Sequence, residues 1–224
     1  MRILMVCLCA SLIALSACKT AGGNAGGGDP SESTIKMYLY GQIKAASFVA
    51  VHDNVSTGQA WETTSTAGGS NLVQTWQITK MTGRGEFIIE NDTGMGYVLA
   101  YRVNTWADAG QPNVLEAWIG TRGRDPESIQ VMEWKSGEAA PMGSEARVET
   151  QSFADVTIAG KTFSGDVMTA SSSSGTTRTW VASNGWFDRV IRMDVNGRTI
   201  LEVSKVHFDE KAPALLKWDN PRAK

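Results

Sequence analysis

Residues 187–208 read FDRVIRMDVNGRTILEVSKVHF, in which two runs rich in Val, Ile and Leu flank the dipeptide Asn196-Gly197. A type I′ turn needs positive φ at both central residues, and Asn and Gly adopt positive φ at the least cost. The dipeptide therefore predicts a tight hairpin between two antiparallel strands, Phe187–Asp194 and Arg198–Phe208. This hairpin makes the expected fold class mainly β.

Similar turn sequences recur along the chain, among them Gly83-Arg84-Gly85, Asn91–Gly94, Ala159–Lys161 and Asn184-Gly185. Alternating apolar residues between them predict strands with one buried face. The other expected strands are Ala60–Thr66, Leu72–Met81, Glu86–Glu90, Tyr97–Asn104, Val114–Thr121, Ser128–Trp134, Arg147–Ile158, Thr162–Ala170 and Thr176–Ser183. Eleven strands with short connections favour one large curved antiparallel sheet or half-open barrel, with a sandwich as the alternative.

Two stretches of the chain resemble each other. Ala117-Trp118-Ile119 leads through a turn to Ile129–Met132, and Thr179-Trp180-Val181 leads through a turn to Val190–Met193. Each copy has the form of a strand, a turn and a returning strand. We therefore expect two similar meanders that lie side by side in one sheet.

One helix is expected, before the first strand. Asp29-Pro30-Ser31-Glu32 is typical of a helix start, with Asp as the N-cap and Pro in the first turn. The apolar residues that follow fall at spacings of three and four, which is the period of one helical face. They are Ile35, Leu39, Ile43, Ala46 and Ala50, and they predict a helix from Pro30 to Val49.

The N-terminus has the layout of a secretory signal: Arg2, a short apolar run, then small residues. Leu15-Ser16-Ala17-Cys18 resembles the lipobox of bacterial lipoprotein precursors. The resemblance implies cleavage before Cys18, removal of residues 1–17 as a signal peptide, and attachment of lipid to the Cys18 sulfur. The expected partner of this end of the chain is thus a membrane, reached through a lipid anchor.

Residues 18–29 are rich in Gly and lack large apolar groups, so they are expected to form a flexible tether. Lys19 stands where Asp commonly retains Gram-negative lipoproteins at the inner membrane, and this favours an outer-membrane location in the cell envelope. Cys7 and Cys9 leave with the signal peptide and Cys18 is consumed by lipid. The folded domain is therefore expected to have neither thiol chemistry nor disulfides.

The family resemblance of the domain is carried by short tryptophan-containing motifs. Gly58-Gln59-Ala60-Trp61-Glu62, Thr75–Ile78, Glu116–Gly120 and Thr179-Trp180-Val181 resemble those of bacterial lipoproteins related to the LolA/LolB carriers. The resemblance implies a half-open antiparallel barrel over residues 30–210, followed by a C-terminal tail, 211–224. It also implies a concave face that holds lipid chains beneath a helical lid.

The chain departs from these carriers because no internal lid helix is expected. The loops Thr105–Gln111 and Lys135–Glu145 are where a lid would lie. A fixed binding role is therefore favoured over shuttling.

Several motifs bear on catalysis. Asp92-Thr93-Gly94 matches the aspartic-protease motif, but no second copy exists and a turn explains it. Ser33–Lys36 fits Ser-x-x-Lys without a Lys-Thr-Gly partner. His52 and His207 are the two histidines, too few for a typical zinc site, and no Gly-x-Ser-x-Gly accompanies them. We expect no catalytic residue, no metal and no cofactor.

Carboxylates and tryptophans on expected strands remain as candidates. A paired-carboxylate hydrolase is the weaker hypothesis, and its candidate residues are Glu62, Glu86, Glu90 and Glu116. Among the eight tryptophans, Trp76, Trp118 and Trp180 lie mid-strand and are the candidates for an apolar ligand-binding surface.

The leading hypothesis is a monomeric envelope lipoprotein that binds a lipid or other apolar ligand without catalysis. The alternative is a structural or interaction module that contacts polysaccharide or a protein. The net charge of −2 gives no reason to expect nucleic-acid binding.

Overall fold

The computed structural model describes most of the domain expected from the sequence. The described residues are 30–51, 55–67, 70–107, 111–133, 147–173, 175–185, 190–209 and 211–218. The expected signal peptide, Cys18, the tether and the Lys135–Glu145 loop lie outside them. No helix among the described residues is long and apolar enough to cross a membrane.

One helix and eleven strands make up the described fold. They are α1 (Pro30–Leu39), β1 (Gln59–Ala67), β2 (Ser70–Gly83), β3 (Glu86–Asp92), β4 (Val98–Asn104), β5 (Val114–Gly120), β6 (Glu127–Ile129), β7 (Arg147–Ile158), β8 (Lys161–Ser172), β9 (Gly175–Ala182), β10 (Val190–Val195) and β11 (Arg198–Phe208).

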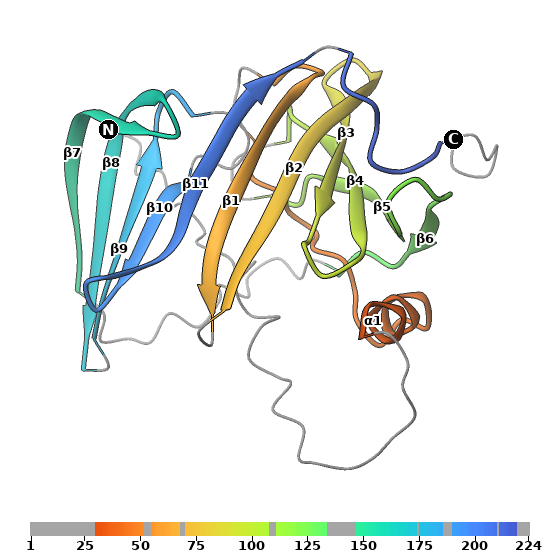
Figure 1. Ribbon diagram of the computed structural model, residues 1–224, viewed down its shortest axis with the longest axis horizontal. Helices are drawn as coiled ribbons and strands as arrows, with labels where there is room; N and C mark the ends of the chain where they lie inside the picture. Colours follow the sequence, from red (N-terminus) through yellow and green to blue (C-terminus); the bar gives the residue numbers. More distant parts are fainter. Residues whose placement is uncertain are drawn as a thin grey trace.

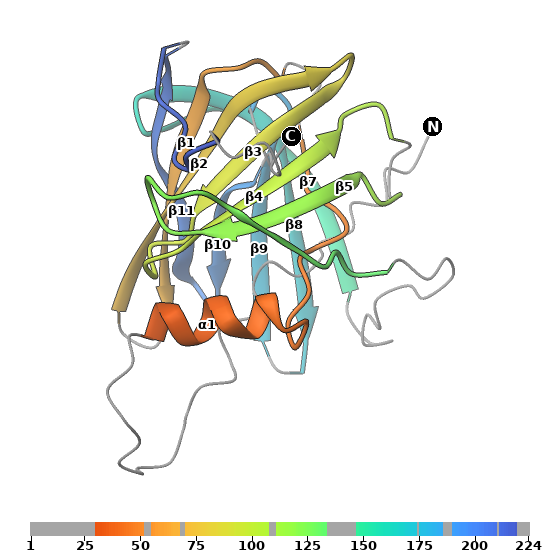
Figure 2. The same cartoon turned by 90° about the vertical axis from the view of Figure 1, so that its right-hand side faces the viewer.

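All eleven strands belong to one antiparallel sheet in the order β6-β5-β4-β3-β2-β1-β11-β10-β9-β8-β7. The sheet consists of two meanders, β1–β6 and β7–β11, joined where β1 pairs with β11 (Figure 1). It curls without closing, so that β4 and β5 lie across from β8 and β9 (Figure 2). The predicted fold class of a large curved sheet is confirmed. The two similar stretches that were expected side by side fall on β5–β6 and β9–β10, which five other strands separate in the sheet.

The Asn196-Gly197 turn has the predicted conformation, since φ is +50° at Asn196 and +75° at Gly197. Ala159 and Gly160 turn the chain between β7 and β8 in the same way, with φ of +51° and +71°. Two-residue turns with positive φ at both positions match the twist of the flanking strands and fix their register.

The predicted helix is too long. The structure ends α1 at Leu39, because Gly41 adopts a φ of +70° and closes the last turn. The Gln42 N–H donates to Met37 O, and the Gly41 N–H donates to Tyr38 O. This is the Schellman arrangement, in which a left-handed glycine satisfies the last helical carbonyls. Residues 42–49 are therefore not helical.

The sixth predicted strand, Ser128–Trp134, is also too long, because β6 ends at Ile129. The chain beyond it pairs instead with the segment after α1. Ala45 N–H donates to Gln130 O at 2.8 Å, and Met132 N–H donates to Ala45 O at 2.8 Å.

The two faces of the sheet have different partners. We call the face that carries Trp61 and Val206 the inner face, and the face that carries Glu62 and Lys205 the outer face; each of these is a directly opposed pair. Directly opposed residues point to the same side of a sheet, and successive residues alternate. The pairing therefore assigns a face to strand residues away from bulges.

The largest core lies on the inner face of β1–β6. Apolar residues of α1 and of the segment up to Val55, including Tyr38, Ala45 and Val49, pack on Trp61, Ile89 and their neighbours. The segment is fixed by Asn113, whose Nδ2 donates to Val49 O at 2.7 Å and whose Oδ1 accepts from Val49 N at 2.8 Å. Figure 2 shows α1 across one end of the sheet.

A separate core cluster lies at the other meander. Its buried members are Ile158, Phe163, Ala182, Ile191 and Val203, and all of them, like the residues packed against them, come from strands. In the described part of the chain, this cluster has no contribution from a helix or loop.

Candidate ligand-binding face

A row of uncharged side chains crosses the inner face from β1 to β8. The register opposes each member to the next, in the order Ser65, Leu201, Met193, Thr179 and Met168. Ser65, Met193 and Thr179 are buried, whereas Leu201 and Met168 are half-buried. The row therefore offers apolar and hydroxyl groups, part of whose surface is open.

Charge is almost absent from this part of the inner face. Among the described inner-face residues of β8–β11, away from the turns, Asp166 is the only charged one. It lies opposite Val181 and accepts a hydrogen bond from Ser152 Oγ at 2.9 Å. An anionic ligand group would therefore find no described cation between the turns of these strands.

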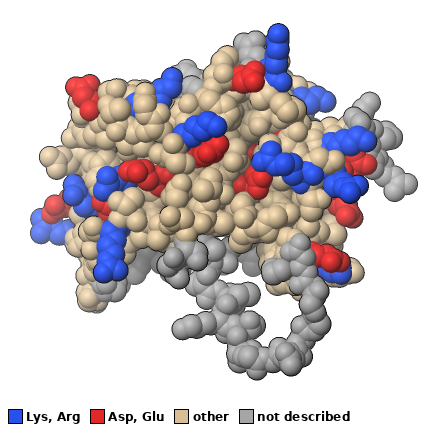
Figure 3. Space-filling view, viewed as in Figure 1, with Lys and Arg blue, Asp and Glu red and all other residues tan. Residues whose placement is uncertain are grey.

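The outer face, unlike the inner face of β8–β11, carries many charged side chains. Ion pairs join Lys205 to Glu62 at 3.3 Å and Arg192 to Glu202 at 3.6 Å. Arg102 lies between two carboxylates, Glu116 at 2.9 Å and Glu86 at 3.6 Å. Figure 3 shows basic and acidic side chains interspersed on this side of the molecule. Where these ion pairs lie, the outer face faces solvent.

The structure does not bring the three candidate tryptophans together. Trp76 lies on the inner face, opposite Trp61, and its ring stacks on Tyr101 at 6.4 Å between centroids. It is partly buried and packs against the core under α1. Burial raises the pKa of Tyr101 above its usual range, so this aromatic pair stays neutral.

Trp118 lies on the outer face and is buried. It packs edge-on against Trp218, with centroids 5.3 Å apart, beneath Leu215 and Leu216 of the C-terminal segment. The C-terminal segment covers this part of the sheet, so Trp118 has a structural partner within the chain.

Trp180 also lies on the outer face, because it opposes Arg192, which opposes Glu202, which opposes Thr64. Its ring is flanked by two guanidinium groups, with Arg178 at 5.0 Å and Arg192 at 5.1 Å from the centroid. Trp76 thus lies on the opposite face of the sheet from Trp118 and Trp180, and the three tryptophans do not form a single surface.

Asn91 is a buried polar residue that sequence reasoning did not single out. It lies on the inner face opposite Trp76, and its Oδ1 has no hydrogen-bond partner among the described residues. A buried acceptor without a partner costs about 1–3 kcal/mol. Asn113, by contrast, has both side-chain groups bonded. The only signal that could have identified Asn91 is its position opposite Trp76 in the strand register.

Glu90 has a structural role that could not be predicted from the sequence. It is 0 % exposed, and it fastens the C-terminal segment to the outer face. Its carboxylate accepts hydrogen bonds from Leu215 N at 2.5 Å, Leu216 N at 3.3 Å and Trp218 Nε1 at 2.7 Å. Burial raises the pKa of this carboxyl, and the three donors oppose that rise. The apolar Leu215-Leu216 pair in the expected tail was the available signal.

The other hydrolase candidates are engaged by cations. Glu62 pairs with Lys205, and Glu86 and Glu116 share Arg102. Asp92 pairs with Arg122 at 2.6 Å and accepts a hydrogen bond from Gly94 N, which is the turn predicted for Asp92-Thr93-Gly94. The described residues hold no cluster of three or more potential metal ligands.

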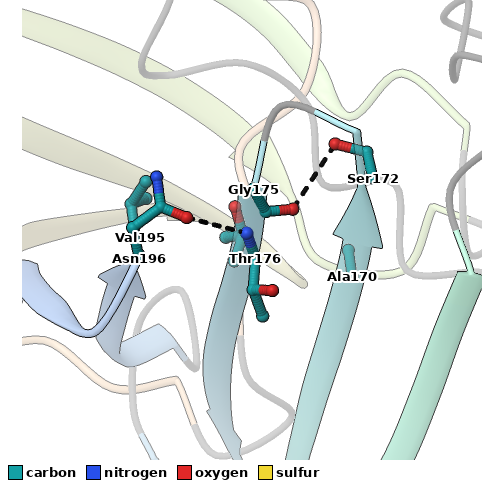
Figure 4. Close-up of a pocket in the computed structure, with 7 residues that line it drawn as sticks. Ala170, Ser172, Gly175, Thr176, Val195 and Asn196 are labelled. Carbon is teal, nitrogen blue, oxygen red and sulfur yellow. Dashed lines mark hydrogen bonds between the residues drawn. The ribbon is translucent and has the colours of Figure 1, made fainter.

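A small pocket of about 160 Å³ lies where the β8–β9 and β10–β11 hairpins meet (Figure 4). Asn196 Oδ1 accepts from Thr176 N there at 2.9 Å, and Ser172 Oγ donates to Gly175 O at 3.4 Å. These hydrogen bonds hold the turns together. The seven described residues that line the pocket carry no charge.

Compared with models of protein families and with curated protein sequences, the chain matches none of them.

Proposed function

We propose that this chain is a membrane-anchored lipoprotein of the cell envelope, related to the LolA/LolB-like superfamily, that binds a lipid or another apolar ligand without catalysis. One observation carries the proposal. Away from the turns, the described inner face of β8–β11 is uncharged except for Asp166 and keeps half-buried apolar side chains. The outer face of β10 and β11, by contrast, carries ion pairs such as Arg192–Glu202 and Lys205–Glu62.

The chemistry of the inner row suits an acyl chain. Leu201 and Met168 contribute apolar surface, and Met side chains adapt to irregular apolar partners. Removing such surface from water is favourable by about 25 cal/mol per Å². An anionic ligand group would lose its hydration there without gaining a cation. The part of the ligand that contacts Leu201 and Met168 is therefore apolar and carries no negative charge.

The proposal is tested by native mass spectrometry of the full-length protein purified from membranes. A bound amphiphile should appear as a mass addition beyond that of the anchor. Leu201→Lys places a charge on the inner face and should reduce its occupancy at least about tenfold, because burying an unpaired charge is costly. Val73→Lys is the matched control, since Val73 is 46 % exposed on the outer face, opposite Thr64.

Two results would contradict ligand binding. One is the absence of any added mass, and the other is equal occupancy in the Leu201→Lys and Val73→Lys variants. The alternative function would then gain support: a structural or interaction module of the envelope. The packing of α1 and the segment up to Val55 over β1–β6 is the observation that favours this alternative, because it fills that half of the inner face.

The anchor has a separate test. Cys18→Ala should either release the protein from the membrane or leave the precursor uncut. Membrane fractionation and size that are unchanged in this variant would contradict the lipoprotein assignment and its expected outer-membrane location. Native mass spectrometry would still test ligand binding by the sheet independently of this result.

A further inference from the structure

Two of the most exposed apolar side chains lie at one end of the sheet. Trp106 is 63 % exposed and Met81 is 62 % exposed, and among the described large apolar residues only Tyr40, at 75 %, exceeds them. Met81 lies near the end of β2, and Trp106 follows β4. We call Lys80, Met81, Arg84 and Trp106 the β2–β3 tip.

The exposed Trp106 ring is held in place by its surroundings. Thr105 N–H donates to Gly85 O at 2.8 Å, and Trp106 N–H donates to Asn104 Oδ1 at 2.9 Å. Gly85 has a φ of +77°, and a Cβ at this position would lie 2.6 Å from the indole ring. The ring thus rests directly on the glycine backbone. Aromatic residues and Met are enriched at interaction surfaces relative to the rest of a protein surface.

The cations of the tip lack carboxylate partners in the described part of the chain. Arg84 lies over the Trp106 ring at 5.5 Å from its centroid. Among the described residues, no carboxylate lies within ion-pair distance of Lys80 or Arg84. Glu86, the nearest acid along the chain, is paired with Arg102. Cations of the outer sheet face such as Arg192 and Lys205 are paired. Among the described residues, the tip therefore carries local positive charge.

We propose that the β2–β3 tip docks on the surface of a phospholipid bilayer that contains anionic lipids. Tryptophan favours the membrane interface, where its ring meets acyl chains and its N–H stays hydrated. The Met81 side chain adds apolar surface, and Lys80 and Arg84 lie where they can contact lipid phosphates. The combination of fixed aromatic, apolar and cationic groups matches this surface better than it matches an uncharged partner.

The tip lies at the end of the sheet opposite α1 (Figure 1). α1 begins where the expected tether ends, and the tether of residues 18–29 spans at most about 40 Å when extended. Docking by the tip is therefore a second membrane contact, distinct from the anchor and from ligand binding on the inner face.

The test uses the full-length lipidated protein in vesicles of phosphatidylcholine, with or without phosphatidylglycerol, and with brominated lipid as a quencher of tryptophan. Bromolipid should quench part of the emission, and Trp106→Phe should abolish that part. The double variant Lys80→Glu, Arg84→Glu should lower the quenching at least about threefold in phosphatidylglycerol vesicles, because each cation favours an anionic surface.

The control variants are Tyr40→Ala, which removes the exposed aromatic at the other end, and Trp218→Phe, which removes a packed tryptophan. Both should leave the quenched part unchanged. If the protein floats with the vesicles but Trp106→Phe changes nothing, the tip proposal is overturned while the anchor stands. If the protein does not float with the vesicles at all, both the lipid anchor and the tip contact are contradicted. Neither result bears on ligand binding to the inner face, which native mass spectrometry tests separately.

Discussion

The two meanders of the sheet share a topology but differ in what covers their inner faces. Over β1–β6, α1 and the segment up to Val55 complete a core around Trp61 and Ile89. Over β7–β11, the described core cluster contains strand residues alone, and Leu201 and Met168 stay half-buried. A sheet face becomes core where the chain supplies a cover. The core cluster of the second half includes no such cover among the described residues, and the part-exposed Leu201 and Met168 are where we propose that a ligand binds.

The largest expected difference between the halves is in stability. Ile89→Ala should lower the free energy of unfolding by about 4 kcal/mol, because it leaves a cavity in a filled core. Leu201→Ala should cost about 1 kcal/mol, because its site is only half-buried. Urea unfolding followed by circular dichroism measures both. Equal losses would show that the two inner faces are equally packed.

Within the covered half, Glu90→Ala should cost about 3 kcal/mol, because three donors lose their acceptor inside the protein. The C-terminal segment should then become sensitive to protease, which mass spectrometry of the fragments detects. Glu62→Ala is the control, since it removes only an exposed ion pair with Lys205. A resistant segment in Glu90→Ala would refute the fastening role.

The same carboxyl predicts a pH dependence. Because the folded pKa of Glu90 is raised above its usual 4.5, its contribution to stability is full below 4.5 and is lost as pH rises through the folded pKa. Glu90→Gln removes this contribution. The stability of the unmodified protein relative to Glu90→Gln should therefore fall as pH rises through that window. Unfolding curves measured across the pH range test it, and a difference that stays constant or grows would contradict the raised pKa.

Two buried asparagines, Asn113 and Asn91, allow a comparison of a hydrogen-bonded side chain with one whose acceptor has no described partner. Asn113→Leu should destabilise by about 2 kcal/mol, because it breaks both bonds to Val49. Asn91→Leu should stabilise by about 1 kcal/mol, because it replaces a buried acceptor that has no described partner. Thermal unfolding distinguishes the two. A loss of stability in Asn91→Leu would mean that Asn91 has a structural partner.

The smallest effect is expected at the β7–β8 turn. Ala159 has a φ of +51°, a conformation that Asn adopts more readily than Ala. Ala159→Asn should therefore raise the free energy of unfolding by about 0.5 kcal/mol. Lys161→Asn, beyond the turn, should not. If the Ala159→Asn variant is less stable than the original chain, the turn geometry is contradicted.

Local signals accounted for most of the fold. Turn dipeptides and alternating apolar residues located all eleven strands, because both depend on residues next to each other in the chain. The helix end was missed although Gly41 was visible, because apolar spacing continued beyond it. The early end of β6 could not be predicted, because the residues after it pair with Ala45, which is distant in the sequence.

The site depended on longer-range geometry. Whether a tryptophan points inward depends on strand register, and the bulges between Glu62 and Thr63 and between Val190 and Arg192 change that register. Trp180 could not be assigned to the outer face without the pairing of Arg192 with Glu202 and of Glu202 with Thr64. Glu90 was visible as a strand carboxylate, but its donors lie more than a hundred residues away. Contacts of that kind arise only in the folded chain.

The most direct test of ligand binding on the inner face of β8–β11 is photo-crosslinking with a diazirine-bearing diacylglycerol, followed by peptide mass spectrometry. Ligand binding there predicts labelling at Met168 and Leu201, on the inner face of β8 and β11. It predicts no labelling at Leu99 of β4 and Ile119 of β5, which lie in the core that α1 helps to form. Labelling confined to the outer face, or equal in the two halves, would contradict it.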